Sequence, residues 1–118
     1  MITYSASGPQ VLDALGDPTR RAIFEQLGER PSAVVDLAAR LPVSRPAVSQ
    51  HLKVLKEAGL VTDVQVGTRR VYSLDPKGLD ELRDYLERFW RTALHSFKTR
   101  VEKENKEKRV NKKGEQHD

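Results

Sequence analysis

Four residues between two short amphipathic segments constrain the fold of this chain more than any other feature of its sequence. Apolar residues recur at helical spacing in the segment 33–40 and again in the segment 45–56. Pro42 ends the first segment, and Ser44 is suited to cap the start of the second. Two helices joined by so short a turn are typical of the helix-turn-helix motif.

Asp-Pro pairs and a glycine mark further helix boundaries. Asp17-Pro18 and Asp75-Pro76 each combine a capping carboxylate with a residue whose φ suits the first helical turn. Gly28 is expected to end the helix that follows the first pair. Ser32 is expected to cap the helix 33–40.

A β-hairpin is predicted directly after the second helix of the motif. Gly59 is expected to end that helix in the left-handed conformation. Leu60–Val66 and Arg69–Leu74 are rich in β-branched and aromatic residues. Gly67-Thr68 between them fits a tight turn that needs a positive φ.

A long helix is predicted from Pro76 to about residue 110, because leucines and aromatic residues recur there at spacings of three and four. At 1.5 Å per residue it would be about 50 Å long. A compact domain of this chain length is only about 28 Å across, so the helix would extend beyond its own core. An apolar stripe on such a helix needs a partner, and a second copy of the chain is the simplest one. The expected dimer interface comprises Val11, Leu12, Leu82, Leu86, Phe89, Trp90, Ala93 and Phe97.

The predicted fold is therefore mainly α with a small β-hairpin, in the order α-α-α-α-β-β-α: a winged helix-turn-helix. We expect a flexible arm at 1–8 and a single domain at 9–110, followed by a disordered basic tail at 111–118. Within the domain, 9–15 and 76–110 are the expected dimerisation helices.

Composition excludes several classes of function. The absence of cysteine excludes disulfides, thiolate metal sites and cysteine nucleophiles. No stretch approaches the roughly 20 apolar residues of a membrane helix, so a cytoplasmic protein is expected. The net charge of +4 favours an anionic partner, although weakly. No phosphate loop, metal cluster or catalytic spacing is present, so no enzymatic activity and no cofactor are expected.

The motif and the hairpin predict where double-stranded DNA would bind. If the apolar stripe of the second helix faces inward, its polar residues project outward at the end that enters a major groove. The hairpin tip would lie along the DNA backbone or in the minor groove. The expected contacts are Ser44, Arg45, Ala47, Ser49, Gln50, His51 and Lys53 from the helix, and Gly67, Thr68, Arg69 and Arg70 from the wing.

Two alternatives stay open from the residues alone. Polar outward residues also occur on the solvated face of an ordinary amphipathic helix, and a charged hairpin tip can serve solubility. Winged helices can also bind other proteins, in which case the long helix would recruit a different partner. A polar and basic face on the second helix of the motif favours DNA over a protein.

The chain resembles the ArsR-type winged-helix repressors in the segments Leu15–Arg21, Val43–Leu55 and Gly67–Tyr72. The resemblance spans about residues 10–100. It implies a homodimer in which the first and last helices pair. It also implies repression of a promoter, often the protein's own, relieved by a signal.

The resemblance also shows where metal-sensing members carry their ligands. Ala33-Val34-Val35 stands where arsenic-type sensors have Cys-Val-Cys. Asp84 and His95 are the nearest matches to the ligands of zinc-type sensors, and neither has its second ligand. The chain therefore resembles a metal-blind branch, without a metal site.

The histidines and aromatic residues receive structural interpretations. His51 is expected to pack or to contact phosphate, His95 to be an interfacial polar residue, and His117 to have no specific role. The aromatic residues of the long helix are interpreted as dimer core. A small-molecule effector, lipid or organic, at that seam is the alternative hypothesis.

Overall fold

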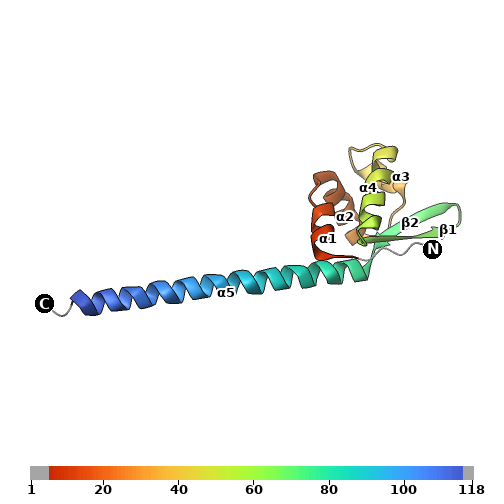
Figure 1. Ribbon diagram of the computed structural model, residues 1–118. Coiled ribbons are helices and arrows are strands. Elements are labelled where there is room, and N and C mark those ends of the chain that lie inside the picture. The colour runs from red at the N-terminus through yellow and green to blue at the C-terminus, as the bar shows by residue number, and fades with distance from the viewer. Residues whose placement is uncertain (1–5, 116–118) are drawn as a thin grey trace. The chain divides into compact units, whose positions relative to one another are not determined.

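The computed structural model of the 118-residue chain describes residues 6–115, with side chains as far as residue 110. It divides into two compact units, Met1–Tyr85 and Leu86–Asp118, which are described separately. Five helices and one hairpin are found in the described residues, which confirms the predicted fold class (Figure 1). The elements are α1 (Gly8–Ala14), α2 (Pro18–Glu29), α3 (Val34–Arg40), α4 (Arg45–Glu57), β1 (Val61–Val66), β2 (Arg69–Leu74) and α5 (Pro76–Glu115).

Short polar side chains begin four of the described helices, and three of them, Asp17, Ser44 and Asp75, are the ones that the sequence predicts. The carboxylate of Asp17 accepts the backbone N–H of Arg20 at 2.9 Å. The hydroxyl of Ser44 accepts the N–H of Ala47 at 3.3 Å, and the carboxylate of Asp75 accepts a backbone N–H from the first turn of α5 at 3.0 Å. Each bond satisfies a backbone donor that has no partner within its helix.

Two predicted boundary residues play other roles. Ser32 does not cap α3: the carboxylate of Asp36 accepts the N–H of Ala33 at 3.1 Å instead. The backbone of Ser32 pairs with Tyr72 of β2 through two hydrogen bonds of 2.9 Å, which attach the α2–α3 connection to the hairpin. Gly28 does not end α2, because the helix continues to Glu29. Its φ is not positive.

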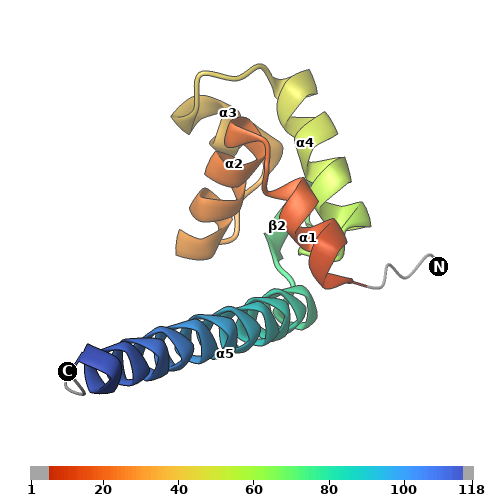
Figure 2. The ribbon, with the colours of Figure 1, turned by 60° about the vertical axis from the view of Figure 1, so that its left-hand side comes forward.

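The core of the first unit lies between α1, α2, α3, α4 and the base of the hairpin (Figure 2). Ile23 of α2 and Leu37 of α3 are fully buried in it, beside residues of α4. Val11 is also 0% exposed, so it is a core residue of the chain itself. The prediction that Val11 lies in the dimer interface is therefore wrong. Leu12, the next residue, is 45% exposed.

The hairpin and the start of α5 depend on glycines at particular points. The strands pair antiparallel from Val61↔Leu74 to Val66↔Arg69, so Gly67 and Thr68 form the turn as predicted. Gly67 has a φ of 62° and Gly59 a φ of 80°, both in the left-handed region. A β-carbon at Gly78 would collide with the carbonyl oxygen of Gly59. The first turn of α5 can therefore approach the end of α4 only because residue 78 is glycine.

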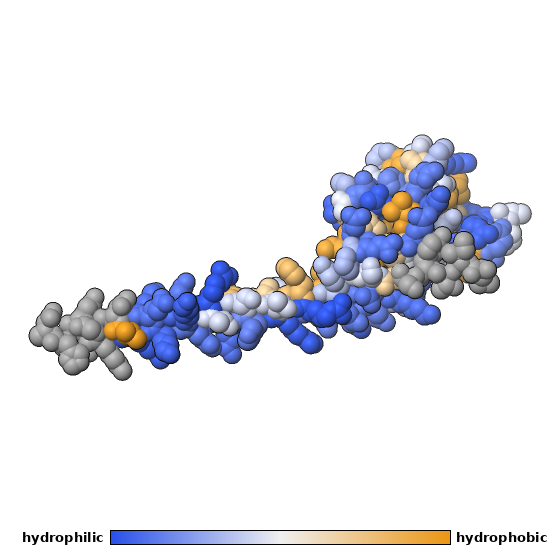
Figure 3. Space-filling model, in the orientation of Figure 1, coloured by the Kyte–Doolittle hydropathy of each residue, from blue (hydrophilic) through white to orange (hydrophobic). Residues whose placement is uncertain are grey.

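The second unit is helical from Leu86 to Glu115, about 45 Å at 1.5 Å per residue. The helix extends five residues past the predicted end at 110, so residues 111–115 belong to α5 and not to a separate tail. Residues 116–118 of the expected tail, His117 included, and residues 1–5 of the expected arm lie outside the described residues. Large apolar side chains are exposed along the first half of this helix, and mostly hydrophilic ones follow (Figure 3).

No helix among residues 6–115 combines the length and the apolar character that crossing a membrane requires.

Candidate nucleic-acid interface

The helix-turn-helix is formed by α3, residues 41–44 and α4. Val48, Leu52 and Leu55 of α4 are all 0% exposed, which confirms the inward stripe that the sequence predicts. Their burial fixes the rotation of the helix, so the side chains on its opposite face project into solvent.

The predicted contact residues of α4 divide into an exposed set and a half-buried pair. Ala47 and His51 are half-buried, between the inward stripe and the outer face. His51 Nδ1 lies 4.0 Å from Asp17 Oδ2, so this histidine packs against the start of α2. The exposed residues are Ser44, Arg45, Ser49, Gln50 and Lys53.

The start of α2 is also tied to α1. The backbone N–H of Arg20 is the main cause that holds the pKa of Asp17 below its ordinary value. The Arg20 side chain donates to the carbonyl of Ala14 at 2.7 Å, and Arg21 donates to the carbonyl of Leu15 at 3.3 Å. These contacts assign the two arginines a structural role.

The tip of the wing is exposed to solvent. Gly67, Thr68, Arg69 and Arg70 are all exposed, as expected of a surface that reaches a nucleic acid. A β-carbon at Gly67 would meet nothing within 4 Å, so its positive φ alone requires glycine here.

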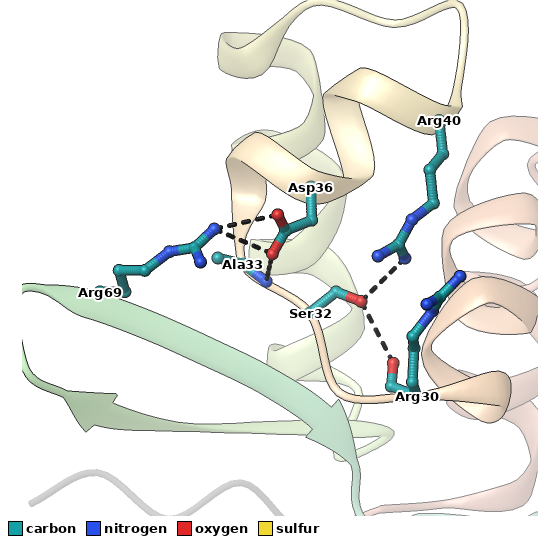
Figure 4. A network of polar contacts seen from close by, with 6 residues as sticks. All are labelled: Arg30, Ser32, Ala33, Asp36, Arg40 and Arg69. Atoms are coloured by element: carbon teal, nitrogen blue, oxygen red, sulfur yellow. Dashed lines mark hydrogen bonds and ion pairs between the residues drawn. The ribbon is translucent and has the colours of Figure 1, made fainter.

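Arg69 is paired with α3. Its Nη2 donates to both carboxylate oxygens of Asp36, at 3.0 Å each (Figure 4). The N–H of Ala33 is the main cause that holds the pKa of Asp36 below its ordinary value, and Arg69 adds to it. The side chains of Arg69 and Asp36 are 52% and 36% exposed, so solvent reaches this ion pair.

Arg70 is paired on the other face of the hairpin. Its Nη1 lies 2.6 Å from Asp63 Oδ2, and Lys56 Nζ of α4 lies 2.7 Å from Asp63 Oδ1. Only 6% of the Asp63 side chain is exposed. Burial alone would raise the pKa of Asp63, but the hydrogen bonds from Lys56 and Arg70 outweigh it and hold the pKa below its ordinary value. The same carboxylate raises the pKa of Lys56.

Asp36 and Asp63 were not among the functional residues predicted from the sequence. Asp63 stands opposite Tyr72 in the hairpin register, and Arg70 is its diagonal neighbour. Asp63 is an isolated acidic residue in a strand, and it lies diagonally across from an arginine in a hairpin with a two-residue turn. This pattern could have identified the pair from the sequence.

Comparisons with known proteins agree with this geometry. A protein-family model described as a helix-turn-helix domain matches residues 15–64. The HTH-type transcriptional regulator Rv2034 of Mycobacterium tuberculosis is 57% identical over 104 residues, which are 88% of this chain and 96% of that protein. An ArsR-like transcriptional regulator from Rhodococcus sp. RHA1, with a solved structure, is 37% identical with a TM-score of 0.66; the match covers 77% of this chain and 89% of that one. This chain belongs to the ArsR-type family of transcriptional regulators. It is accordingly a DNA-binding transcriptional regulator.

Within the ArsR-type family, the chain also resembles a named repressor. The transcriptional repressor SmtB of Mycobacterium tuberculosis is 42% identical over 80 residues, and the match covers 61% of this chain and 59% of that protein. At the positions of the arsenic-type ligands, Ala33 is the residue before α3 and Val34 and Val35 begin the helix. Among residues 6–110, whose side chains the structure describes, no group of three or more His, Cys, Asp or Glu could hold a metal ion.

Proposed function

We propose that this ArsR-type chain is a homodimeric repressor that reads an inverted-repeat operator with α4 and grips the DNA backbone with the wing. The observation that carries the proposal is the exposed polar face of α4, opposite a stripe of three fully buried residues. The wing tip, exposed and basic, supplies the second contact.

The exposed residues of α4 match the chemistry of base edges and phosphates. An arginine such as Arg45 can donate two hydrogen bonds to guanine, and Gln50 can pair with adenine. Ser49 and Lys53 suit base or phosphate contacts. The N-terminal end of α4 adds partial positive charge where phosphate would lie. Ser44, Ala47 and His51 are proposed to contact the backbone beside them.

The wing would add affinity without reading sequence. Gly67 and Thr68 expose backbone and hydroxyl groups, and Arg69 supplies a cation at the tip. Phosphate contacts of this kind are sequence-independent and weaken as salt is added.

The dimer is proposed to form on the apolar face of α5. Phe89 and Trp90 are 64% and 63% exposed, and aromatic residues of this size dominate the energy of protein interfaces. The other proposed interface residues of this helix are Leu82, Leu86, Ala93 and Phe97, together with Leu12 from α1. A winged helix-turn-helix domain from Mycobacterium bovis, 28% identical with a TM-score of 0.57, is described as homodimeric, and the match covers 74% of this chain and 79% of that one.

Repression is proposed from the relatives. SmtB and the transcriptional repressor SdpR of Bacillus subtilis, which is 33% identical over 79 residues (67% of this chain and 88% of that protein), both carry that function in their names. A dimer that occupies successive major grooves, about 34 Å apart, would block access of polymerase to a promoter. A small-molecule effector at the α5 seam stays a hypothesis.

Fluorescence anisotropy tests the proposal with two labelled duplexes at about 150 mM salt, where non-specific attraction is damped. One duplex carries the DNA directly upstream of the protein's own gene, and the other its scrambled sequence. We expect the upstream duplex to bind about a hundredfold more tightly. Gln50→Ala should reduce this ratio, whereas Arg69→Ala should weaken both duplexes equally. Equal and strongly salt-dependent binding of both duplexes by the wild type would contradict an autorepressor.

The protein-recruiting alternative predicts a different result. A winged helix whose long helix recruits a different protein would show no preference between the duplexes at any salt concentration. An acidic or apolar exposed face on α4 would favour this alternative, whereas Arg45, Gln50 and Lys53 are polar or basic.

A further inference from the structure

The two wing arginines are held by carboxylates on opposite faces of the hairpin, but the two pairs differ in burial. Neighbouring residues of a strand point to opposite faces, so Arg69 reaches Asp36 of α3 and Arg70 reaches Asp63 of β1 (Figure 4 shows the first pair). Asp36 is 36% exposed and Asp63 only 6%. The pairs therefore differ in how easily a DNA phosphate could replace the carboxylate.

An exposed pair exchanges partners at little cost, because water solvates each charge when it is released. A phosphate can thus take Arg69 from Asp36. A buried carboxylate that loses its partners leaves an uncompensated charge inside the protein, which is strongly unfavourable. Arg70 and Lys56 are therefore bound to Asp63 far more firmly than Arg69 is bound to Asp36.

The Asp63 carboxylate joins three elements at one point. Lys56 lies in the last turn of α4, Asp63 in β1 and Arg70 in β2, and each cation approaches a different oxygen, at 2.7 Å and 2.6 Å. The end of the helix proposed to read DNA is thereby fixed to both strands of the wing. The angle between α4 and the wing decides whether both can contact one duplex at the same time.

We propose that Asp63 is a positioning residue for DNA recognition, which locks the wing to α4 through Lys56 and Arg70. Arg70, predicted from the sequence as a DNA contact, acts through Asp63 and not by binding phosphate. Arg69 is the wing arginine that binds phosphate. The inference rests on the proposed interface of α4 and the wing.

The opposite role for Asp63 predicts effects of opposite sign. If Asp63 only competes with DNA for two phosphate-binding cations, Asp63→Asn releases them and every duplex binds more tightly. If Asp63 positions the wing, Asp63→Asn loosens the wing and binding of the preferred duplex weakens. The sign of the change distinguishes the two roles.

The first measurement needs no DNA. Hydrogen exchange of the hairpin amides is followed in the full-length wild type, Asp63→Asn and Asp36→Asn, after circular dichroism has shown that each variant is folded. We expect faster exchange in β1 and β2 for Asp63→Asn, by about tenfold, and little change for Asp36→Asn, because only the first loses a buried partner. Unchanged hairpin exchange in Asp63→Asn would overturn the proposal.

The second measurement uses the duplex that the wild type enriches from a random-sequence pool, beside a scrambled duplex, over a range of salt. We expect Asp63→Asn and Arg70→Met each to lower the preference for the enriched duplex by about tenfold, with an unchanged salt slope. The double variant should lower the preference for the enriched duplex no further than either single variant does. Asp63→Glu should restore part of the preference that Asp63→Asn loses. Arg69→Ala should instead lower the salt slope by about one without changing the preference.

Three results would overturn the positioning role. They are tighter binding of both duplexes by Asp63→Asn, a salt slope lowered by about one in Arg70→Met, and a folded Asp63→Asn that keeps the full preference. If the wild type enriches no duplex, the proposed function fails. The exchange measurement then decides alone. Faster hairpin exchange in Asp63→Asn would still support the proposal that Asp63 locks the wing to α4, and unchanged exchange would contradict it.

Discussion

Three carboxylates of the first unit show how one side-chain type takes different roles at different depths. Asp17 begins α2 and contacts His51. Asp36 satisfies the backbone N–H of Ala33 and also holds Arg69. Asp63 is buried between two cations. The capping contacts of Asp17 and Asp36 each span only three residues, and that of Asp17 was predicted. The contacts of Asp36 with Arg69 and of Asp63 with its two cations form only when the hairpin is in place, and they were not predicted.

We predict that Asp36→Asn strengthens binding to DNA of any sequence. The asparagine oxygen can still accept the N–H of Ala33, so the start of α3 should be kept, but Arg69 is released and a negative charge beside the wing is lost. Affinity for a scrambled duplex should rise by about twofold to fivefold, since exposed ion pairs are weak. Anisotropy titration measures this affinity. The matched control is Asp13→Asn, which removes one negative charge from the exposed side of α1. An equal increase in both variants would show that only net charge matters.

We predict that the contribution of Asp63 to stability is lost in acid. Its pKa in the folded chain lies below the ordinary value of 3.8, so the folded state favours the ionised form. Its stabilising effect is therefore complete above about pH 5 and declines as the pH falls through the folded pKa. The difference in free energy of unfolding between wild type and Asp63→Asn, from urea titrations at several pH values, should shrink below about pH 4. A difference that grows in acid would contradict the assigned direction.

At the scale of elements, the boundary residues that act locally were predicted correctly, whereas the roles of residues with long-range partners were not. Asp17, Ser44, Gly59 and Gly67 act within a few residues of themselves, and each was placed correctly from sequence. Ser32 was not, because its backbone partner is Tyr72, which becomes a neighbour only after the hairpin forms. Periodicity likewise identified Val11 as apolar on a helix, but it could not say whether the chain's own core or another chain covers it.

The same limit applies to the candidate site. The exposed face of α4 follows from the spacing of its buried residues, so sequence alone identified Arg45, Ser49, Gln50 and Lys53 as exposed. The pairing of Arg69 and Arg70 with carboxylates depends on how the hairpin approaches α3 and α4. No local pattern specifies that approach.

We predict opposite effects of one substitution at two glycines. Gly78→Ala brings a β-carbon into the carbonyl of Gly59 and should cost about 1–3 kcal/mol of stability. At Gly28, near the end of α2, a β-carbon would meet only Leu74 at 3.6 Å, an ordinary contact. Gly28→Ala should therefore stabilise the chain, by about 0.5–1 kcal/mol, because alanine favours helices. Thermal unfolding measures both, and a stable Gly78→Ala would contradict the close approach of α5 to α4.

At the scale of the whole molecule, the exposed apolar face of α5 requires a covering surface. Leu86, Phe89, Trp90, Leu94, Phe97 and Val101 are all more than a third exposed in the single chain. Exposed apolar stripes of this extent mark interaction sites. A second copy of α5 satisfies both chains at once, since a two-fold axis pairs the same face with itself.

We predict that Trp90→Glu dissociates the dimer. A buried aromatic residue at the centre of an interface is worth at least about thirtyfold in Kd, and a buried glutamate would add to the loss. Sedimentation equilibrium should show monomers at concentrations where the wild type is dimeric. Thr92→Glu introduces the same charge about 200° around the helix, away from the stripe, and should stay dimeric. Equal dissociation by both variants would place the interface elsewhere.

Site-directed cleavage of DNA shows whether α4 of each subunit enters a major groove of one operator. Because the chain has no cysteine, Ser49→Cys offers a single attachment point for an iron chelate that cuts nearby DNA. The control is Glu29→Cys, an exposed residue at the far end of α2 from Asp17 and His51.

If α4 of each subunit enters a major groove, the Ser49 probe alone should give two symmetric clusters of cuts, about ten base pairs apart, on the duplex enriched from a random pool. Cutting that is no stronger from Ser49 than from Glu29, or that is spread evenly along the duplex, would contradict it.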